Sequence, residues 1–123
     1  MNIRFLSNNY AVAQQITPAD IDDLREQGFA ALVCTRPDGE EAGQPAFAAI
    51  GAQARAAGME AFWLPVTPGR ITDADRAAFA VLYANAPKPV LGFCRTGLRA
   101  ETLWNDTRDR RDAVAAQQAR PGD

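Results

Sequence analysis

Three short apolar segments alternate with segments of helical periodicity along this chain. They are residues 29–34, 61–64 and 90–93, and each is followed by a loop that contains proline or glycine. Apolar runs of this length, without polar alternation, are typical of parallel strands that are covered on both faces. The pattern therefore predicts a βαβαβα order and an α/β fold, with a mainly parallel central sheet flanked by helices.

Local signals predict the elements around these strands. Thr17 followed by Pro18, and Thr72 followed by two aspartates, are typical of helix N-caps. Apolar residues recur at helical spacing over about residues 45–57. Residues 3–6 and 10–13 flank a turn-prone Ser-Asn-Asn segment and predict a strand pair. We assign the aromatic side chains of the later strands to the core, namely Phe62, Trp63 and Phe93.

Length and composition fit a single domain. The 123 residues are 47% hydrophobic, which is enough for one core. We expect residues 1–112 to form a catalytic domain, and residues 113–123 to form the end of the C-terminal helix and a frayed tail. The net charge of −2 argues against a nucleic-acid partner. Two cysteines, no long apolar run and no signal-peptide pattern predict a cytoplasmic protein without membrane contact.

The absence of histidine narrows the chemistry. It excludes Cys–His catalysis and leaves only two thiols and scattered carboxylates as metal ligands. We therefore expect neither a metal site nor a cofactor.

The third apolar segment ends at Cys94, and the residues after it form a candidate anion site. Gly97 lets the backbone bend and a helix is expected from Arg99 onward, so the order is strand, tight loop, helix. Backbone amides can then point into one concavity, where the helix N-terminus and the guanidinium groups of Arg95 and Arg99 add positive potential. Such a field favours a thiolate, so Cys94 is the candidate nucleophile and Arg99 the candidate anion ligand. The loop between them, Arg95, Thr96, Gly97 and Leu98, is expected to line the anion site.

This loop resembles the signature loops of cysteine phosphatases and rhodaneses. Phosphatase loops hold five residues between cysteine and arginine, whereas rhodanese loops hold four, as does the segment between Cys94 and Arg99. Phosphatases usually also have a histidine before the cysteine and a hydroxyl residue after the arginine, where this chain has Phe93 and Ala100.

Further segments extend the resemblance to most of the chain. Residues 10–18, 36–41, 64–72 and 94–99 look like four landmarks of the phosphatase-like sulfurtransferase domains, which are rhodanese-like in activity. Such domains are often fused to, or encoded beside, β-lactamase-like persulfide dioxygenases. The resemblance implies a fold similar to that of dual-specificity cysteine phosphatases.

The resemblance also implies a function and partners. Cys94 would take sulfane sulfur from a donor such as thiosulfate or glutathione persulfide, and its persulfide would pass the sulfur to a thiol or to cyanide. A small-molecule sulfur donor and a thiol acceptor are therefore expected partners, and a β-lactamase-like persulfide dioxygenase is a candidate partner protein.

Two alternatives stay open. A cysteine phosphatase is one, although expelling an alkoxide or phenoxide benefits from a general acid, and residues 65–71, where the resemblance would place it, contain no carboxylate. A non-catalytic anion-binding domain is the other, because such a loop can bind an anion without turnover.

Secondary site residues are expected where the first apolar segment ends. Cys34 would end a strand beside that of Cys94, so the two thiols either come within disulfide range or Cys34 is a buried spectator. Arg36 and Asp38 lie in the next loop, which should meet the Cys94 loop at the carboxyl ends of the strands.

The same loop carries three acidic residues, Asp38, Glu40 and Glu41. They could orient Arg99 or an incoming thiol. Charged residues in turn-rich loops are usually solvated, however, and carboxylates beside the site would oppose thiolate formation. We therefore expect this acidic group to be solvated.

Overall fold

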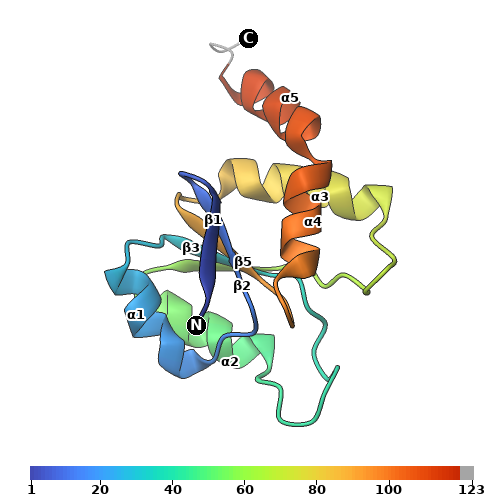
Figure 1. Cartoon of the computed structure of the whole chain (residues 1–123). Coiled ribbons are helices and arrows are strands. Elements are labelled where there is room, and N and C mark those ends of the chain that lie inside the picture. The colour runs from blue at the N-terminus through green and yellow to red at the C-terminus, as the bar shows by residue number, and fades with distance from the viewer. Residues whose placement is uncertain (120–123) are drawn as a thin grey trace.

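The strand that precedes Cys94 lies at the centre of a five-stranded sheet (Figure 1). In the computed structural model, which describes residues 1–119, the strand order is β1-β2-β5-β3-β4. The strands span Ile3–Ser7 (β1), Tyr10–Ala13 (β2), Ala31–Cys34 (β3), Glu60–Trp63 (β4) and Val90–Phe93 (β5). β1 pairs antiparallel with β2 and the other pairs are parallel, which confirms the predicted sheet and the N-terminal strand pair.

Helices cover both faces of this sheet. α1 (Ile21–Glu26), preceded by a short 3-10 turn (Pro18–Asp20), and α2 (Phe47–Ala56) lie on one face. The helices α3 (Asp73–Asn85) and α4 (Leu98–Asp106) lie on the other face, and α5 (Arg108–Gln118) packs against α3. The predicted α/β architecture is therefore confirmed.

The central strands divide their side chains between two apolar clusters. In β5, Leu91 and Phe93 pack beneath α1 and α2, whereas Val90 packs beneath α3 and α4. Because side chains alternate across a strand, four-residue apolar segments can serve both clusters at once. This is why β2, β3 and β5 are buried along their whole length.

The predicted N-caps are present. The backbone N–H of Thr17 donates to Asp20 Oδ2 at 2.8 Å, and the N–H of Thr72 donates to Asp75 Oδ2 at 2.9 Å. At the second cap, Thr72 Oγ1 also accepts from the Asp75 N–H at 3.1 Å. These contacts satisfy donors that the first helical turn leaves unpaired.

A tyrosine links β2 to the helix that follows Cys94. The Tyr10 hydroxyl donates to the Ala100 carbonyl at 3.1 Å, and Tyr10 is fully buried. The Tyr10 side chain can reach Ala100 because it passes over a glycine of β5. A Cβ on Gly92 would lie 2.0 Å from the Tyr10 hydroxyl oxygen, so a larger residue would block this side chain. Gly92 and Tyr10 together fix the height of α4 above the sheet.

The C-terminal part of the chain is helical as far as the structure describes it. Residues 113–118 continue α5. Of the frayed tail predicted at residues 119–123, Ala119 is the C-cap of α5 and residues 120–123 lie outside the described residues. Within residues 1–119, no helix combines the length and the apolar character that crossing a membrane requires.

Candidate functional site

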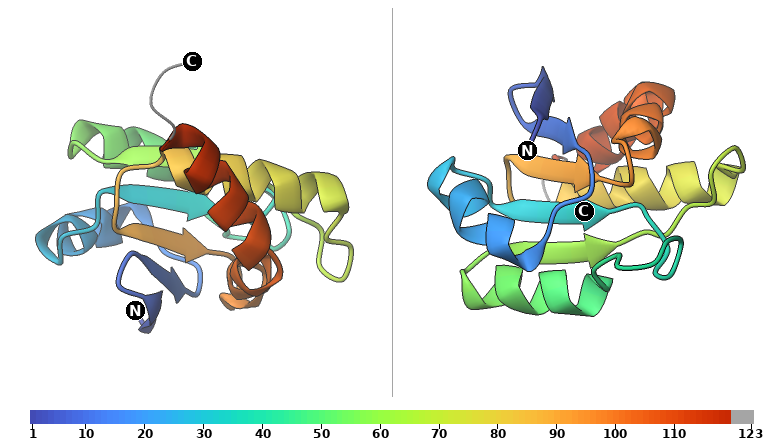
Figure 2. Two further views of the ribbon diagram at one scale, coloured as in Figure 1. Left: turned by 90° about the horizontal axis from the view of Figure 1, so that it is seen from above. Right: turned by 60° about the horizontal axis from the view of Figure 1, so that its bottom comes forward.

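The loop after Cys94 lies at the edge of the sheet where the parallel strands end. Figure 2 shows β5, β3 and β4 pointing to the same side, where the loops that follow them converge. Backbone hydrogen bonds hold the base of the loop: Thr35 N–H donates to Phe93 O at 2.9 Å, and Gln15 N–H donates to Arg95 O at 3.3 Å. The predicted convergence of the loops is therefore present.

Gly97 shapes this loop. Its φ of 96° lies in the left-handed region, and a Cβ there would meet the Ala13 carbonyl oxygen at 3.3 Å. In this conformation the Gly97 N–H donates to Cys94 Sγ at 3.1 Å. An amide directed at a sulfur stabilises negative charge on it, and the first turn of α4 adds to the effect. Cys94 itself is only 1% exposed, at the base of the loop.

Arg99, in the first turn of α4, connects the Cys94 loop to two other loops. Its guanidinium NH1 donates to Glu40 Oε2 at 2.8 Å and to the Val66 carbonyl at 2.9 Å, and NH2 donates to Glu40 Oε1 at 2.9 Å. Glu40 comes from the loop between β3 and α2, and Val66 from the loop between β4 and α3. The sequence singled out Arg99, but a backbone carbonyl such as that of Val66 carries no sequence signal.

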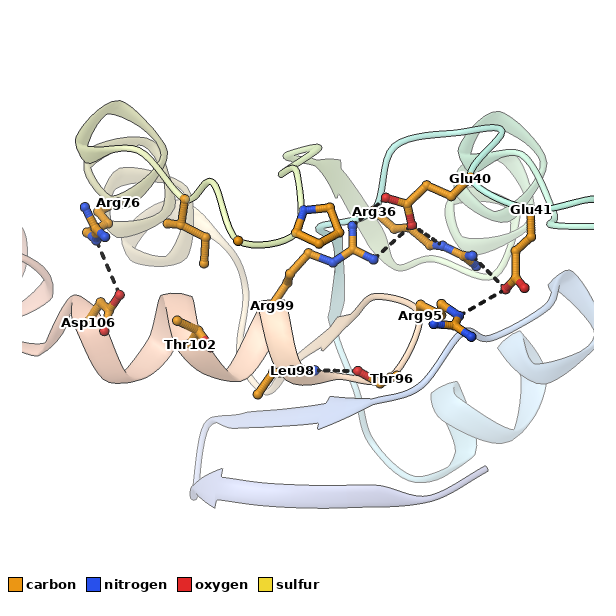
Figure 3. Close-up of a pocket in the computed structure, with 13 residues that line it drawn as sticks. Arg36, Glu40, Glu41, Arg76, Arg95, Thr96, Leu98, Arg99, Thr102 and Asp106 are labelled. Atoms are coloured by element: carbon orange, nitrogen blue, oxygen red, sulfur yellow. Dashed lines mark hydrogen bonds and ion pairs between the residues drawn. The ribbon is translucent and has the colours of Figure 1, made fainter.

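Arginine and glutamate side chains alternate in a chain of ion pairs across this site (Figure 3). The order is Arg99, Glu40, Arg36, Glu41, Arg95. Arg36 Nε lies 2.8 Å from Glu40 Oε1, and Arg36 NH2 lies 2.8 Å from Glu41 Oε1. Arg95 Nε lies 3.5 Å from Glu41 Oε1 and is mostly exposed. Three arginines thus share two carboxylates.

Of the three acidic residues, Glu40 pairs with Arg99, the alternative that the sequence left open, although the residue stays exposed to solvent. The hydrogen bonds from Arg99, and then those from Arg36, lower the pKa of Glu40 to about 2. While these hydrogen bonds are in place, Glu40 stays ionised at neutral pH and has no proton to donate. Glu40 and Arg99 are far apart in sequence, so the spacing of the acidic residues could not reveal which of them reaches the arginine.

Arg36 and Asp38, the predicted secondary residues of this loop, have different surroundings. Arg36 is fully buried, and besides its two carboxylates its NH1 donates to Gln15 Oε1 at 3.0 Å. A buried guanidinium is tolerated because it is paired in this way. Asp38 lies outside the ion-pair chain: its Oδ1 accepts from the Phe47 N–H at 2.9 Å, at the start of α2.

Cys34 ends β3, beside the Cys94 strand as predicted, but its environment is apolar. It packs in the cluster beneath α1 and α2, and its Sγ donates to the Arg36 carbonyl at 3.4 Å. Burial, the largest cause, raises the pKa of the Cys34 thiol to about 11. Both cysteines are free thiols.

Trp63 corrects one core assignment. Phe93 is buried and Phe62 packs against the core, but Trp63 is 44% exposed because it ends the edge strand β4. Its ring stacks on Phe47 with centroids 5.4 Å apart, and its Nε1–H donates to the Arg36 carbonyl at 3.0 Å. Trp63 therefore supports the backbone of the charged loop from outside.

An open pocket of about 800 Å³ lies beside the Cys94 loop. The loop residues Arg95, Thr96, Leu98 and Arg99 line one side, and Pro68, Gly69 and Ile71 line another. Of its three carboxylates, Glu40 and Glu41 belong to the ion-pair chain, and Asp106 lies 3.3 Å from Arg76 Nε. The loop of residues 65–71 contributes no carboxylate, as the sequence predicted. Each acidic group found around the pocket is thus paired with an arginine.

The chain matches a known domain family over most of its length. Residues 2–109 match the model of the phosphatase-like domain of β-lactamase hydrolase-like protein. A β-lactamase hydrolase-like protein of Agrobacterium fabrum is 40% identical over 99 residues, covering 80% of this chain and 23% of that protein. One from Xylella fastidiosa is 34% identical over 121 residues, covering 94% of this chain and 28% of that protein. The chain thus spans about a quarter of the length of these curated relatives.

Solved structures support the fold. A candidate phosphatase from Neisseria meningitidis Z2491 has a TM-score of 0.81 and 35% identity, covering 94% of this chain and 89% of that chain. TpbA from P. aeruginosa has a TM-score of 0.58 and 18% identity, covering 77% of this chain and 54% of that chain, and shows likeness of fold alone. The predicted cysteine-phosphatase-like fold is confirmed, whereas sulfur transfer stays a prediction. This chain belongs to the family of the phosphatase-like domain of β-lactamase hydrolase-like proteins.

Proposed function

We propose that this domain is a cysteine-dependent phosphatase, in which Cys94 is the nucleophile and Arg99 binds the oxygens of the phosphoryl group. One observation carries the proposal: the Cys94 sulfur receives the Gly97 N–H at 3.1 Å at the start of α4, and Arg99 lies in the first turn of that helix. The likeness to the candidate phosphatase of Neisseria meningitidis supports phosphate as the substrate group.

The reaction would run in two steps. The Cys94 thiolate attacks phosphorus, so that an S–P bond forms while the P–O bond to the leaving group breaks and its oxygen departs with the electron pair. Water then attacks phosphorus, the S–P bond breaks, and phosphate leaves with the thiolate restored. The loop amides and Arg99 would stabilise the charge on the phosphoryl oxygens in both steps.

The surroundings of the site restrict the substrates. A general acid is commonly worth about 10²–10⁴-fold in rate when a poor leaving group must be protonated. The loop of residues 65–71 has no carboxylate, and Glu40, as long as it is paired with Arg99, is ionised with a pKa of about 2. We therefore expect a preference for leaving groups that are stable anions, and hence for aryl phosphates over alkyl phosphates.

Sulfur transfer is a second candidate, favoured by the length of the loop. Four residues separate Cys94 from Arg99, the spacing that the rhodanese resemblance implies. The Cys94 thiolate would attack the outer sulfur of thiosulfate, forming an S–S bond while sulfite departs with the electron pair of the broken bond. An acceptor thiolate or cyanide would then take that sulfur and restore the Cys94 thiolate. No leaving group in this scheme needs a proton.

Partners and location are part of this second proposal. A β-lactamase-like persulfide dioxygenase would consume the persulfide product formed on a small thiol. A cytoplasmic setting would suit two cysteines that are both free thiols.

Side-by-side assays test both candidates. Hydrolysis of aryl phosphates with graded leaving groups is measured beside sulfur transfer from thiosulfate and glutathione persulfide to cyanide, with Cys94→Ser as the blank. Mass spectrometry of the trapped intermediate distinguishes a phosphoryl group on Cys94 from a single added sulfur. A phosphatase gives rates that rise steeply as the leaving group becomes more stable. Turnover of thiosulfate with a persulfide on Cys94, and no aryl phosphate hydrolysis, would replace the first proposal by the second. Absence of both activities would favour a non-catalytic anion-binding domain.

A further inference from the structure

The Glu40 carboxylate accepts from both terminal nitrogens of Arg99, two of the donors that this side chain can offer to a substrate anion. Its two oxygens accept from NH1 and NH2 of Arg99 at 2.8 and 2.9 Å, which is the two-pronged geometry by which arginine binds phosphate and sulfonate groups (Figure 3). An anion that uses the same two donors must first displace this carboxylate.

Arg99 has other contacts besides Glu40 that help to hold its position. Its NH1 also donates to the Val66 carbonyl at 2.9 Å, and its side chain rises from the first turn of α4, directly after the fixed loop glycine Gly97. Arg99 is also largely buried, so the surrounding atoms limit its movement. Removing the carboxylate should therefore free the guanidinium rather than disorder it.

Glu40 has a second ion-pair partner, Arg36, which it can keep if it moves away from Arg99. Arg36 Nε lies 2.8 Å from Glu40 Oε1, the oxygen that Glu40 also offers to Arg99. If Glu40 turns away from Arg99, it can keep this ion pair and stay charged without being isolated. Arg36 in turn keeps Glu41 and Gln15 as partners in either arrangement.

We propose that Glu40 is an internal competitor for the anion site, whose carboxylate must leave Arg99 before a substrate binds there. This inference rests on the proposed function of the Cys94 loop as an anion site. Because the competitor lowers the apparent affinity of any anion by the same factor, only groups with high intrinsic affinity bind at low concentration. Dianionic tetrahedral groups fit this requirement, since their second negative charge strengthens the attraction to the guanidinium groups of Arg99 and Arg95. Phosphoryl groups and thiosulfate both belong to this class.

Sulfate binding to the purified chain tests the proposal. Sulfate is a tetrahedral dianion that needs no reaction with Cys94, and calorimetric titration at constant ionic strength gives its dissociation constant. Glu40→Gln removes the competing charge and is expected to tighten sulfate binding by roughly tenfold, the usual weight of a charge-assisted contact. Glu41→Gln is the matched control, because it removes the same charge from the same loop while Glu41 pairs with Arg36 and Arg95 rather than with Arg99. For Glu41→Gln we expect a change of about threefold or less, as for a partly exposed ion pair.

The outcomes separate this inference from the proposed function. Weaker or unchanged sulfate binding in Glu40→Gln would mean that Glu40 does not compete with the anion but holds Arg99 in place. Equal tightening in Glu40→Gln and Glu41→Gln would mean that the loss of one negative charge near the pocket, and not the loss of a competitor on Arg99, causes the change. Either result overturns the inference even if the chain turns over phosphate esters, whereas the expected tightening supports it even if no turnover is found. If Glu40→Gln does not fold, as judged by thermal melting, Glu40→Asp takes its place. That shorter carboxylate cannot reach Arg36 and Arg99 together, so tighter sulfate binding supports the proposal and unchanged or weaker binding contradicts it.

Discussion

Cys34 and Cys94 end neighbouring parallel strands, are both buried, and yet have opposite surroundings. The Cys94 sulfur accepts a hydrogen bond from the Gly97 amide, whereas the Cys34 sulfur donates one to the Arg36 carbonyl. Donation to a carbonyl requires the protonated thiol, and acceptance from an amide favours negative charge on sulfur. The residues that follow each strand therefore decide what its terminal cysteine can do.

The largest expected contrast is between substitutions of the two cysteines themselves. Cys94→Ser should lower turnover by on the order of 10³-fold or more, because a hydroxyl is far less ionised than a thiol. Cys34→Ala should lower it by about threefold or less, since only core packing is changed. Steady-state rates for whichever reaction the chain catalyses check the pair. If Cys34→Ala were as damaging as Cys94→Ser, the two thiols would work together and the contrast would fail.

Arg99 gives the next largest effect, because it lies in the first turn of α4, directly after the Cys94 loop. Arg99→Lys should lower kcat/KM by about 100-fold, since lysine keeps the charge but loses the two-pronged contact. Arg95→Lys, at a mostly exposed arginine of the same loop, serves as the control and should cost about threefold or less. Full activity in Arg99→Lys would reduce Arg99 to a source of positive field.

The pH dependence of the free energy of unfolding tests whether the Cys34 thiol is buried and protonated in the folded chain. In the unfolded chain this thiol loses its proton near pH 9, whereas burial raises its pKa in the folded chain to about 11. The folded state therefore binds more protons between these values, so the stabilisation is complete below pH 9 and is lost as the pH rises through 11. We expect Cys34 to account for a fall of about 2 kcal/mol in the free energy of unfolding between pH 8 and 11.

Urea unfolding across this pH range isolates the contribution of Cys34. The fall should be smaller in Cys34→Ala than in the wild type, because the other alkaline titrations remain in both proteins. Identical pH profiles would show that the Cys34 thiol titrates in the folded chain as it does in the unfolded chain.

The smallest effect concerns the loop glycine that aims an amide at Cys94. Gly97→Ala forces an alanine into a left-handed conformation and should destabilise the chain by about 1 kcal/mol. Gly58→Ala is a matched control, because Gly58 has a φ of 85° and nothing within 4 Å of an added Cβ. We expect similar losses of stability but about a tenfold loss of activity in Gly97→Ala alone. Equal activity in the two variants would mean that the Gly97 amide is not needed.

Local signals predicted most of the fold. Thr72 and Asp75 are three residues apart, so their reciprocal cap could be inferred from sequence, and the apolar runs identified the buried strands. The parallel pairing of β2 with β5 could not be inferred in this way, because it joins Tyr10 to Val90 across most of the chain. Trp63 was misplaced because the apolar pattern does not reveal which strand lies at an edge of the sheet.

The same division holds for the candidate site. The positions of Cys94, Gly97 and Arg99 follow from one short segment. The structure places Cys94 directly after β5, and Gly97 and Arg99 at the start of α4, as that segment predicts. The contact of Glu40 with Arg99 spans 59 positions and depends on how two loops converge, so the sequence could only name Glu40 as one of three candidate acids. The contact of Arg99 with the Val66 carbonyl depends on a convergence of the same kind, with the loop that follows β4.

Trp63 should allow movements of the loop that carries Arg36 and Glu40 to be followed by tryptophan fluorescence. Its half-exposed indole is bonded to the carbonyl of Arg36, whose side chain holds Glu40, so a shift of this loop would alter the polarity around the ring and hence its emission. The second tryptophan, Trp104, lies in the cluster on the opposite face of the sheet, with the Arg111 guanidinium carbon 3.4 Å from a ring centroid. The chain thus carries one fluorophore beside the site and another on the far side of the sheet. Stopped-flow fluorescence on unlabelled protein could therefore time the departure of Glu40 as an anion arrives.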